Sequence, residues 1–122
     1  MKQKKILIAD DNQNIREILI AILEDAGHSV WVAKDGIEAL SKVQELSPEI
    51  LILDIMMPGM SGYDVCRTIK NHPDLKKTFI LMLSAKNQVT EQELGKEVGA
   101  DDYLIKPFRP SDLLARIDSY PG

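Results

Sequence analysis

The sequence predicts a doubly wound α/β domain built on a parallel sheet. Five short apolar segments of strand length alternate with five segments of helical periodicity, and the connections between them are short. Such alternation is typical of right-handed crossovers, which place helices on both faces of a parallel sheet. The chain has 122 residues, enough for one compact domain with its own core, so we expect residues 1–122 to form a single domain.

The expected strands are short and rich in β-branched and aliphatic residues. Three of them are apolar at nearly every position, as expected for strands that helices cover on both faces. The expected strands are 6–9, 30–33, 50–53, 79–83 and 103–105.

The first two expected helices have clear boundary signals. From Ile15 to Ala26, apolar residues recur at i, i+3, i+4, i+7, i+8 and i+11, and Gly27 then supplies a stop. Asp35 and Glu38 have the spacing of a capping box and precede further apolar residues at helical spacing, which indicates the second helix.

Three more helices are expected in the second half of the chain. The third covers about residues 62–71. Thr90 and Glu93 have the spacing of a cap for the fourth, which ends at Gly99. Pro110 suits the first turn of the fifth. Five strands in so small a domain favour the flavodoxin-like strand order 2-1-3-4-5.

Polar residues stand at the carboxyl ends of four of the five expected strands. Asp10 and Asp11 follow the first strand, Asp54 follows the third, Ser84 follows the fourth and Lys106 follows the fifth. In the order 2-1-3-4-5, the first and third strands are neighbours where the order reverses, and ligands of such sheets bind there. A single Asp at a strand end is more often a helix cap or a loop residue, so the joint pattern carries the prediction.

The expected cluster suits a hard cation and a phosphoryl group. Two carboxylates 4 Å apart repel by about 4 kcal/mol at an effective dielectric constant near 20, so three of them favour protonation or a bound cation. Oxygen ligands without nearby His or Cys favour a hard cation, and a shallow site that keeps several waters suits Mg²⁺ better than Ca²⁺. Lys106 and Ser84 would neutralise and hydrogen-bond phosphoryl oxygens, and one carboxylate could act as the nucleophile.

Composition excludes several other classes of protein. Nineteen acidic against 15 basic residues give a net charge of −4, which disfavours direct nucleic-acid binding by this domain. A single cysteine excludes an internal disulfide and a cysteine-rich zinc site. The sequence has neither a signal-peptide core nor an apolar run of membrane-spanning length, so we expect a cytoplasmic protein with no membrane partner.

Four stretches resemble the receiver domain of two-component response regulators, and the resemblance covers nearly the whole chain. They are Ile-Leu-Ile-Ala-Asp-Asp-Asn at 6–12, Leu-Ile-Leu-Asp-Ile-Met-Met-Pro-Gly-Met-Ser-Gly at 51–62, Leu-Ser-Ala at 83–85, and Gly-Ala-Asp-Asp-Tyr-Leu-Ile-Lys-Pro-Phe at 99–108. Their spacing also matches that family.

The resemblance implies a role for each polar residue. Asp54 matches the phospho-acceptor, and Asp10 and Asp11 match the acidic pair that holds Mg²⁺, with Asp11 as the direct ligand. Met56 matches the residue whose backbone carbonyl completes the metal shell.

Four further positions match the family's switch region. Lys106 matches the lysine that pairs with the phosphate, and Ser84 matches the switch hydroxyl. Tyr103 matches the aromatic residue that turns inward when this hydroxyl moves, and Pro107 matches a cis proline.

The implied function is a phosphorylation-activated signalling switch. A histidine kinase or a phosphotransfer protein would donate a phosphoryl group to Asp54, and the face formed by the fourth helix, the fifth strand and the fifth helix would change. That face would act on a downstream effector or on a covalently linked output domain, of which this chain contains none. The domain would be a monomer or a phosphorylation-dependent homodimer.

The expected chemistry stops at the protein itself. The domain would catalyse its own phosphorylation and slow dephosphorylation, and it would turn over no external metabolite. Dephosphorylation is expected to be slow because neither Met56 nor Lys86, which flank the path of the attacking water, is an acid or an amide.

The fourth helix is the expected mobile element. Its apolar content is chiefly Leu94 and Val98, and the interior Gly95 destabilises a helix by roughly 1 kcal/mol. We therefore expect it to be the least firmly docked helix.

An apolar rim is expected beside the acidic residues. Ile15 and Ile18 near the start of the first helix, together with Pro107 and Phe108, would suit a helix of the phosphodonor. Core packing is the alternative interpretation, which is favoured for Ile18 and equally weighted for Ile15 and Phe108.

The residues disfavour two rival functions, the second of which shares this topology. A Mg²⁺-dependent aspartate-nucleophile phosphatase of the haloacid dehalogenase type needs a second acid two residues after the nucleophile, and this chain has Met56 there. Such an enzyme usually also has a cap domain, for which 122 residues leave no space. A flavin-binding electron carrier needs a phosphate loop rich in Ser, Thr and Gly, where this chain has Asp-Asp-Asn-Gln.

Overall fold

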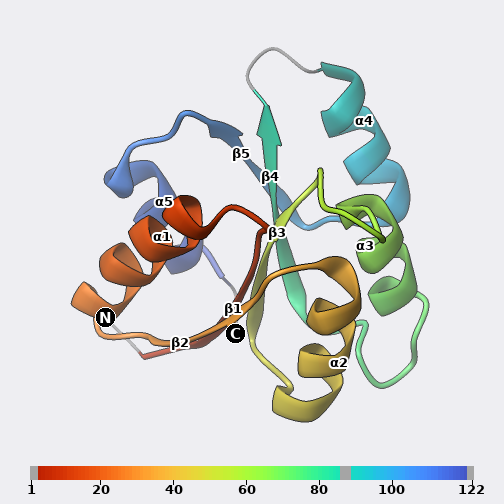
Figure 1. Ribbon diagram of the computed structural model, residues 1–122, viewed down its shortest axis with the longest axis horizontal. Helices are drawn as coiled ribbons and strands as arrows, with labels where there is room; N and C mark the ends of the chain where they lie inside the picture. Colours follow the sequence, from red (N-terminus) through yellow and green to blue (C-terminus); the bar gives the residue numbers. More distant parts are fainter. Residues whose placement is uncertain (1–2, 86–88, 121–122) are drawn as a thin grey trace.

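A five-stranded parallel sheet forms the centre of the protein (Figure 1). The computed structural model describes residues 3–85 and 89–120. Its strand order is β2-β1-β3-β4-β5, as predicted. The strands are β1 (Lys5–Ala9), β2 (Ser29–Ala33), β3 (Ile50–Asp54), β4 (Phe79–Ala85) and β5 (Asp102–Lys106).

Five helices alternate with the strands, and each predicted helix is present. The helices are α1 (Gln13–Asp25), α2 (Gly36–Leu46), α3 (Gly62–Lys70), α4 (Val89–Val98) and α5 (Pro110–Asp118). The Asp35 half of the predicted capping box of α2 is confirmed, because the Asp35 carboxylate accepts a hydrogen bond from the backbone N–H of Glu38 at 2.8 Å. The Glu38 carboxylate accepts from the N–H of Lys34 at 3.2 Å instead of that of Asp35. The helix α4 begins at Val89, one residue before the predicted cap Thr90.

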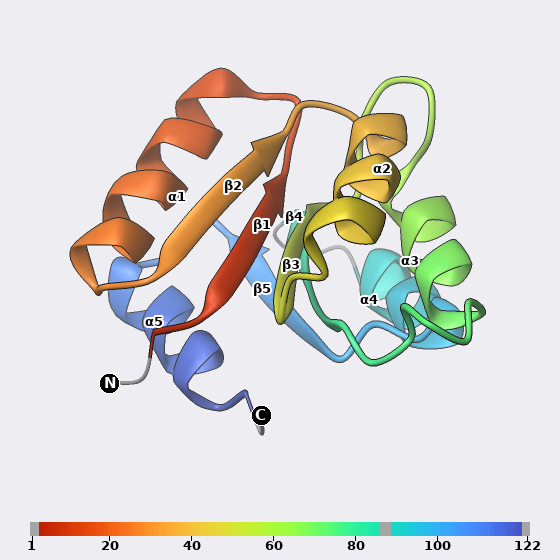
Figure 2. The ribbon, with the colours of Figure 1, turned by 90° about the horizontal axis from the view of Figure 1, so that it is seen from below.

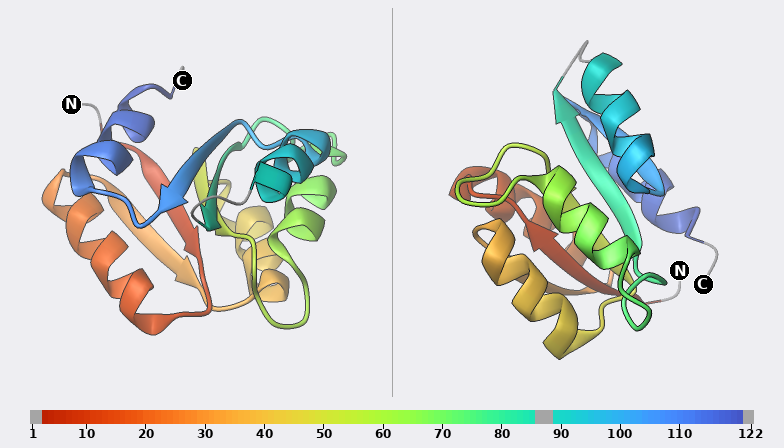
Figure 3. Two further views of the ribbon diagram at one scale, coloured as in Figure 1. Left: turned by 90° about the horizontal axis from the view of Figure 1, so that it is seen from above. Right: turned by 90° about the vertical axis from the view of Figure 1, so that its right-hand side faces the viewer.

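The helices cover both faces of the sheet (Figure 2). The helices α1 and α5 lie on one face, and α2, α3 and α4 lie on the other (Figures 2 and 3). Successive strand residues point to opposite faces, so alternate side chains of β1, β3 and β4 fill two separate buried cores. These three strands are almost fully buried, which explains their continuous apolar sequences.

The two ends of the described chain lie at the amino edge of the sheet, where the strands begin (Figure 2). The ring of Tyr120, just after α5, packs edge-on against Phe79 at the start of β4, with 5.6 Å between ring centroids. In the described residues, no helix is both long and apolar enough to span a bilayer.

Candidate functional site

The carboxyl ends of β1, β3 and β5 bring charged side chains together. The strand register pairs Ala9 of β1 with Leu53 of β3. The residues that follow them, Asp10 and Asp54, therefore lie at the same edge of the sheet. Carboxylate oxygens of Asp10, Asp11 and Asp54 lie within 4.8 Å of one another. We call these three aspartates and Lys106 the acidic edge.

The loop between β1 and α1 is held by hydrogen bonds on both sides of Asp10. The buried Asp10 carboxylate accepts a hydrogen bond through Oδ1 from the backbone N–H of Asn12 at 2.9 Å. Asn12 in turn caps α1 by accepting from the N–H of Ile15 at 3.1 Å. The Arg16 guanidinium reaches back from α1 and donates to the backbone carbonyl of Asp10 at 2.7 Å. Asp11 is exposed beside this loop.

The backbone of Asp54 is packed directly against the first residue of α3. A Cβ atom at Gly62 would lie 2.2 Å from the carbonyl oxygen of Asp54, so only glycine fits here without a backbone shift. The N–H of Gly62 also donates to the carbonyl of Ile55 at 2.8 Å. The Met56 side chain, two residues after Asp54, is 72% exposed.

Lys106 lies between two carboxylates. Its Nζ is 3.1 Å from Oδ1 of Asp54 and 3.6 Å from Oδ2 of Asp10. Burial, reinforced by the charge of Asp10, raises the pKa of Asp54 above the ordinary carboxyl range, and the Lys106 ammonium opposes this rise. The site therefore holds more negative charge than a single ammonium neutralises.

The acidic edge fits a metal ion. Oδ2 of Asp10 is buried and has no hydrogen-bond partner among the described residues. A buried carboxylate oxygen without a donor is energetically costly, and a cation in contact with it would remove that cost. The atoms available to bind a metal ion are all oxygens, which hard divalent cations prefer.

Ser84 lies near the carboxyl end of β4, whereas Tyr103 lies near the start of β5. Ser84 is buried in β4 and follows Leu83, which pairs with Asp54. Tyr103 stands three residues before Lys106 in β5 and packs with the core beneath α2 and α3. Its hydroxyl is buried without a hydrogen-bond partner among the described residues, and burial raises its pKa.

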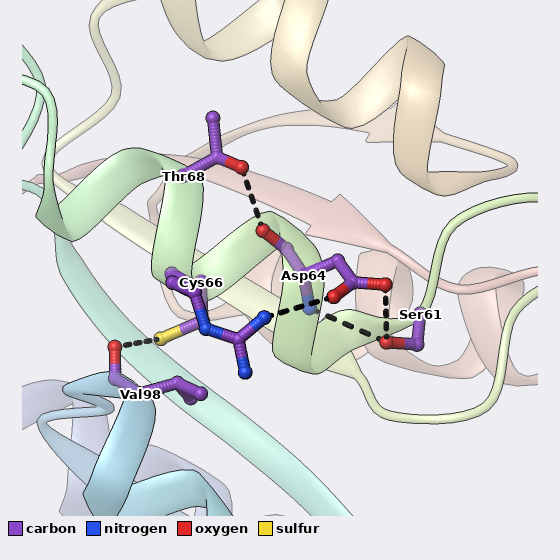
Figure 4. A network of polar contacts seen from close by, with 6 residues as sticks. Ser61, Asp64, Cys66, Thr68 and Val98 are labelled. Atoms are coloured by element: carbon purple, nitrogen blue, oxygen red, sulfur yellow. Dashed lines mark hydrogen bonds and ion pairs between the residues drawn. The ribbon is translucent and has the colours of Figure 1, made fainter.

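The buried Cys66 joins α3 to the end of α4. Its thiol donates to the backbone carbonyl of Val98 at 3.5 Å (Figure 4). Burial raises the pKa of Cys66 to about 11, so the thiol stays protonated at neutral pH and is a poor nucleophile. Nearby, Asp64 contacts the Ser61 cap on the exposed side of α3 (Figure 4). The Asp64 carboxylate also accepts a hydrogen bond from the Arg67 guanidinium.

One prediction about the apolar rim is wrong. Core packing was the favoured role of Ile18, but its side chain is 53% exposed. It lies at the border of the apolar stripe of α1, where helical spacing alone does not separate core from surface. Ile18 and Ile15 instead line a pocket of about 460 Å³ together with Pro107 and Phe108.

Two other expectations concern the loops around the site. The peptide bond between Lys106 and Pro107 is cis, as the family resemblance implied. Lys86 lies outside the described residues.

Sequence reasoning missed Arg16 and Gly62. The spacing of Arg16 from Asp10 gave no chemical signal, because its role depends on how far a long side chain reaches back across a helix turn. A glycine after a serine cap is a weak signal of close packing, and only the three-dimensional contact reveals its role.

Comparisons with known proteins agree with this geometry. Residues 6–118 match the family model of the response regulator receiver domain. The DNA-binding response regulator MtrA of Mycobacterium tuberculosis (strain ATCC 25618 / H37Rv) is 42% identical over 115 residues, which are 94% of this chain and 49% of MtrA. The chain spans about half the length of the curated relatives it matches.

Solved structures share the whole fold. The chemotaxis protein CheY4 of Vibrio cholerae has a TM-score of 0.90 at 36% identity, and the match covers 98% of this chain and 99% of that one. The receiver domain of the Pseudomonas aeruginosa sensor histidine kinase PA1611, solved with a magnesium ion in its active site cleft, has a TM-score of 0.90 at 25% identity, covering 98% of each chain. The chain therefore belongs to the response regulator receiver domain family of two-component signalling switches.

Proposed function

We propose that the acidic edge accepts a phosphoryl group on Asp54 with the help of Mg²⁺. One observation carries the proposal: the Asp54 carboxylate lies 3.1 Å from the Lys106 ammonium and beside the carboxylates of Asp10 and Asp11. A nucleophilic oxygen, a fixed cation and a cation-binding cluster thus share one place. Phosphoryl transfer requires these three elements, because charge builds on the transferred oxygens.

The proposed reaction is a transfer from a phosphohistidine. An oxygen of Asp54 attacks phosphorus, the phosphorus–nitrogen bond breaks, and its electron pair stays on the imidazole nitrogen, which then takes up a proton. The product is an acyl phosphate on Asp54. Lys106 lies close enough to Asp54 to pair with a phosphoryl oxygen.

Mg²⁺ would be held by Asp10, Asp11, Asp54 and the backbone carbonyl of Met56. When bound, it supplies positive charge for the oxygens of the phosphoryl group. The Oδ2 of Asp10, which has no hydrogen-bond partner among the described residues, and the all-oxygen set of metal ligands support this assignment. The protein acts on itself, catalysing its own phosphorylation and slow dephosphorylation.

We place the phosphodonor at the pocket beside α1. The donor is a histidine kinase or a phosphotransfer protein, which presents its histidine on a helix. Ile15, Ile18 and Phe108 would contact that helix, because they line one apolar pocket next to Lys106, in which Ile18 is exposed and Ile15 and Phe108 are half-buried. Apolar area that stays exposed next to a reactive group suits a transient protein partner.

The proposed output face consists of α4, β5 and α5. Ser84 and Tyr103 would couple the phosphoryl group to this face. Ser84 follows Leu83, which pairs with Asp54 in the sheet, and Tyr103 lies in β5. The Tyr103 hydroxyl, buried without a hydrogen bond in the described chain, gives its ring a reason to change position. Leu94 of α4 and Ile105 of β5 are 40% and 42% exposed, which leaves apolar surface for a partner.

We further propose that the domain is cytoplasmic and acts as one receiver unit. Its output is read by a separate effector or by a covalently linked output domain. The length of the curated relatives, about twice that of this chain, supports the second possibility. The receiver would be a monomer or a phosphorylation-dependent homodimer.

The proposal is tested by intact mass after incubation with acetyl phosphate and Mg²⁺. We expect a gain of one phosphoryl group that disappears in Asp54→Asn and in EDTA. Asp64→Asn, which removes an exposed carboxylate of α3, should be labelled like the wild type. Labelling of Asp54→Asn, or labelling unchanged by EDTA, would refute the assignment.

Two further experiments test the surface for the phosphodonor and the coupling to the output face. With a histidine-phosphorylated phosphotransfer protein as donor, Ile18→Ala should slow labelling, whereas labelling by acetyl phosphate should be unchanged. Hydrogen exchange in α4, β5 and α5 should change on phosphorylation in the wild type and change less in Tyr103→Ala. Equal responses in both proteins would exclude Tyr103 from the coupling.

A further inference from the structure

The arginine in the first turns of α1 is attached to the backbone of a proposed metal ligand. Arg16 is half-buried, and its Nη1 donates to the carbonyl oxygen of Asp10 at 2.7 Å. The same loop is held from its other side, because the Asp10 carboxylate accepts from the N–H of Asn12. Arg16 therefore closes a ring of contacts that runs from Asp10 through Asn12 into α1 and back.

We infer that Arg16 is a positioning residue for the metal site. By fixing the carbonyl of Asp10 against α1, it fixes the direction of the Asp10 side chain, whose Oδ2 lies 3.6 Å from Lys106 without a hydrogen bond. Metal affinity depends strongly on how outer groups orient the ligands. The inference rests on the proposed function in one respect, namely that a divalent cation binds the acidic edge.

The direction in which Mg²⁺ affinity changes distinguishes a positioning role of Arg16 from a pure charge effect. If the guanidinium acted only as a charge, it would repel Mg²⁺, and neutralising it would tighten binding. If it acts by holding Asp10, neutralising it releases the loop and weakens binding. Loss of an outer-shell contact typically lowers metal affinity by 10–100-fold, so we expect a loss of roughly tenfold.

The experiment is a Mg²⁺ titration of the full chain by calorimetry. Arg16→Met and Arg16→Gln remove the positive charge, and we expect each to raise the Kd for Mg²⁺ roughly tenfold. Arg16→Lys retains the charge and an ammonium group that can donate, so it should give an intermediate Kd. Arg67→Met is the matched control, because Arg67 is exposed on α3 and pairs only with Asp64 among the described residues. It should bind like the wild type.

A second readout separates ligand positioning from a general loss of fold. The rate of labelling by acetyl phosphate at saturating Mg²⁺ should stay within about twofold of the wild type, while the Mg²⁺ concentration for half-maximal rate rises as the Kd does. Two neutral variants are included so that one folded protein suffices for the measurement.

Two outcomes would overturn the inference. If the wild type binds Mg²⁺ and the folded neutral variants bind it equally or more tightly, Arg16 has no positioning role and the proposed function stands. If the wild type itself binds no Mg²⁺, the metal site fails, and the inference fails with it.

Discussion

His28 is a buried titratable side chain at the edge of the sheet opposite the acidic edge. It is 4% exposed, and its Nδ1 accepts a hydrogen bond from the backbone N–H of Lys4 at 3.1 Å. This contact assigns the proton of the neutral ring to Nε2. Burial, followed by the charge of Lys4, lowers the pKa of His28, although Asp118 and Glu49 oppose the shift.

Protonation of His28 should therefore weaken the fold. A lowered pKa in the folded state means that the unfolded chain binds the proton more tightly, so stability is lost as pH falls below about 6.5. His28 changes the free energy of unfolding by at most about 1.4 kcal/mol per pH unit. Urea unfolding between pH 7.5 and 5.5 should show a steeper loss in the wild type than in His28→Asn. Parallel curves would contradict the assigned shift.

The site residues differ in how far the sequence determined them. Asp10, Asp54 and Lys106 could be predicted to meet, because each stands at the end of an apolar strand and parallel strands end at one edge. Arg16 could not be predicted, since nothing in the sequence records where its long side chain reaches. The error at Ile18 has a similar origin: position on a helix stripe does not determine whether a neighbour covers it.

The helix α3 packs directly against the end of β3. Its first residue, Gly62, contacts the backbone of Asp54, and its end is tied to the sheet by Lys70, which donates to Asp101 and to the carbonyl of Thr78, both at 2.7 Å. The helix is thus fixed at both ends, and its first turn supports the acidic edge.

Gly62→Ala should damage both the fold and the site. The added methyl group would meet the carbonyl of Asp54, and overpacking of this kind typically costs about 1–3 kcal/mol. Gly27→Ala is the control: its φ of +93° disfavours alanine, but no atom lies within 4 Å of the added group. Urea unfolding should show losses in both variants, whereas Mg²⁺ affinity should fall only in Gly62→Ala. Normal affinity in Gly62→Ala would show that α3 does not set the position of Asp54.

Elements were more predictable than their ends. Alternating apolar and amphipathic segments gave five strands and five helices in the right order, because burial between two helical layers imposes that pattern. Boundaries moved by one or two residues where backbone pairing extends beyond the apolar run, as at Asp102 and Lys106 in β5. In α4, Val98 is buried and Leu94 is 40% exposed, and the weak docking of this helix stays a prediction.

At the scale of the whole molecule, the acidic edge lowers stability. The raised pKa of Asp54 means that the folded protein binds this proton more tightly than the unfolded chain. The resulting stabilisation is present below the ordinary carboxyl pKa and is lost as pH rises through the raised value. At neutral pH the ionised Asp54 therefore opposes folding.

Asp54→Asn should accordingly stabilise the metal-free protein. We expect its free energy of unfolding at pH 7 in EDTA to exceed that of the wild type by roughly 1 kcal/mol. Saturating Mg²⁺ should reduce or reverse this difference, because the wild type gains binding energy by linkage. Glu45→Gln, an exposed change on α2, should stay within about 0.5 kcal/mol in both conditions. A destabilised Asp54→Asn in EDTA would contradict this account of Asp54.

The burial of Cys66 makes the molecule easy to label at a chosen point. It is the chain's single cysteine, and its protonated, enclosed thiol should react slowly with maleimides. A cysteine introduced at the exposed Ser119 would then carry a dye or a surface linker selectively. Ser119 follows α5 and directly precedes Tyr120, whose ring packs against Phe79 at the amino edge of the sheet. The tethered protein would keep its reactive face open to solution.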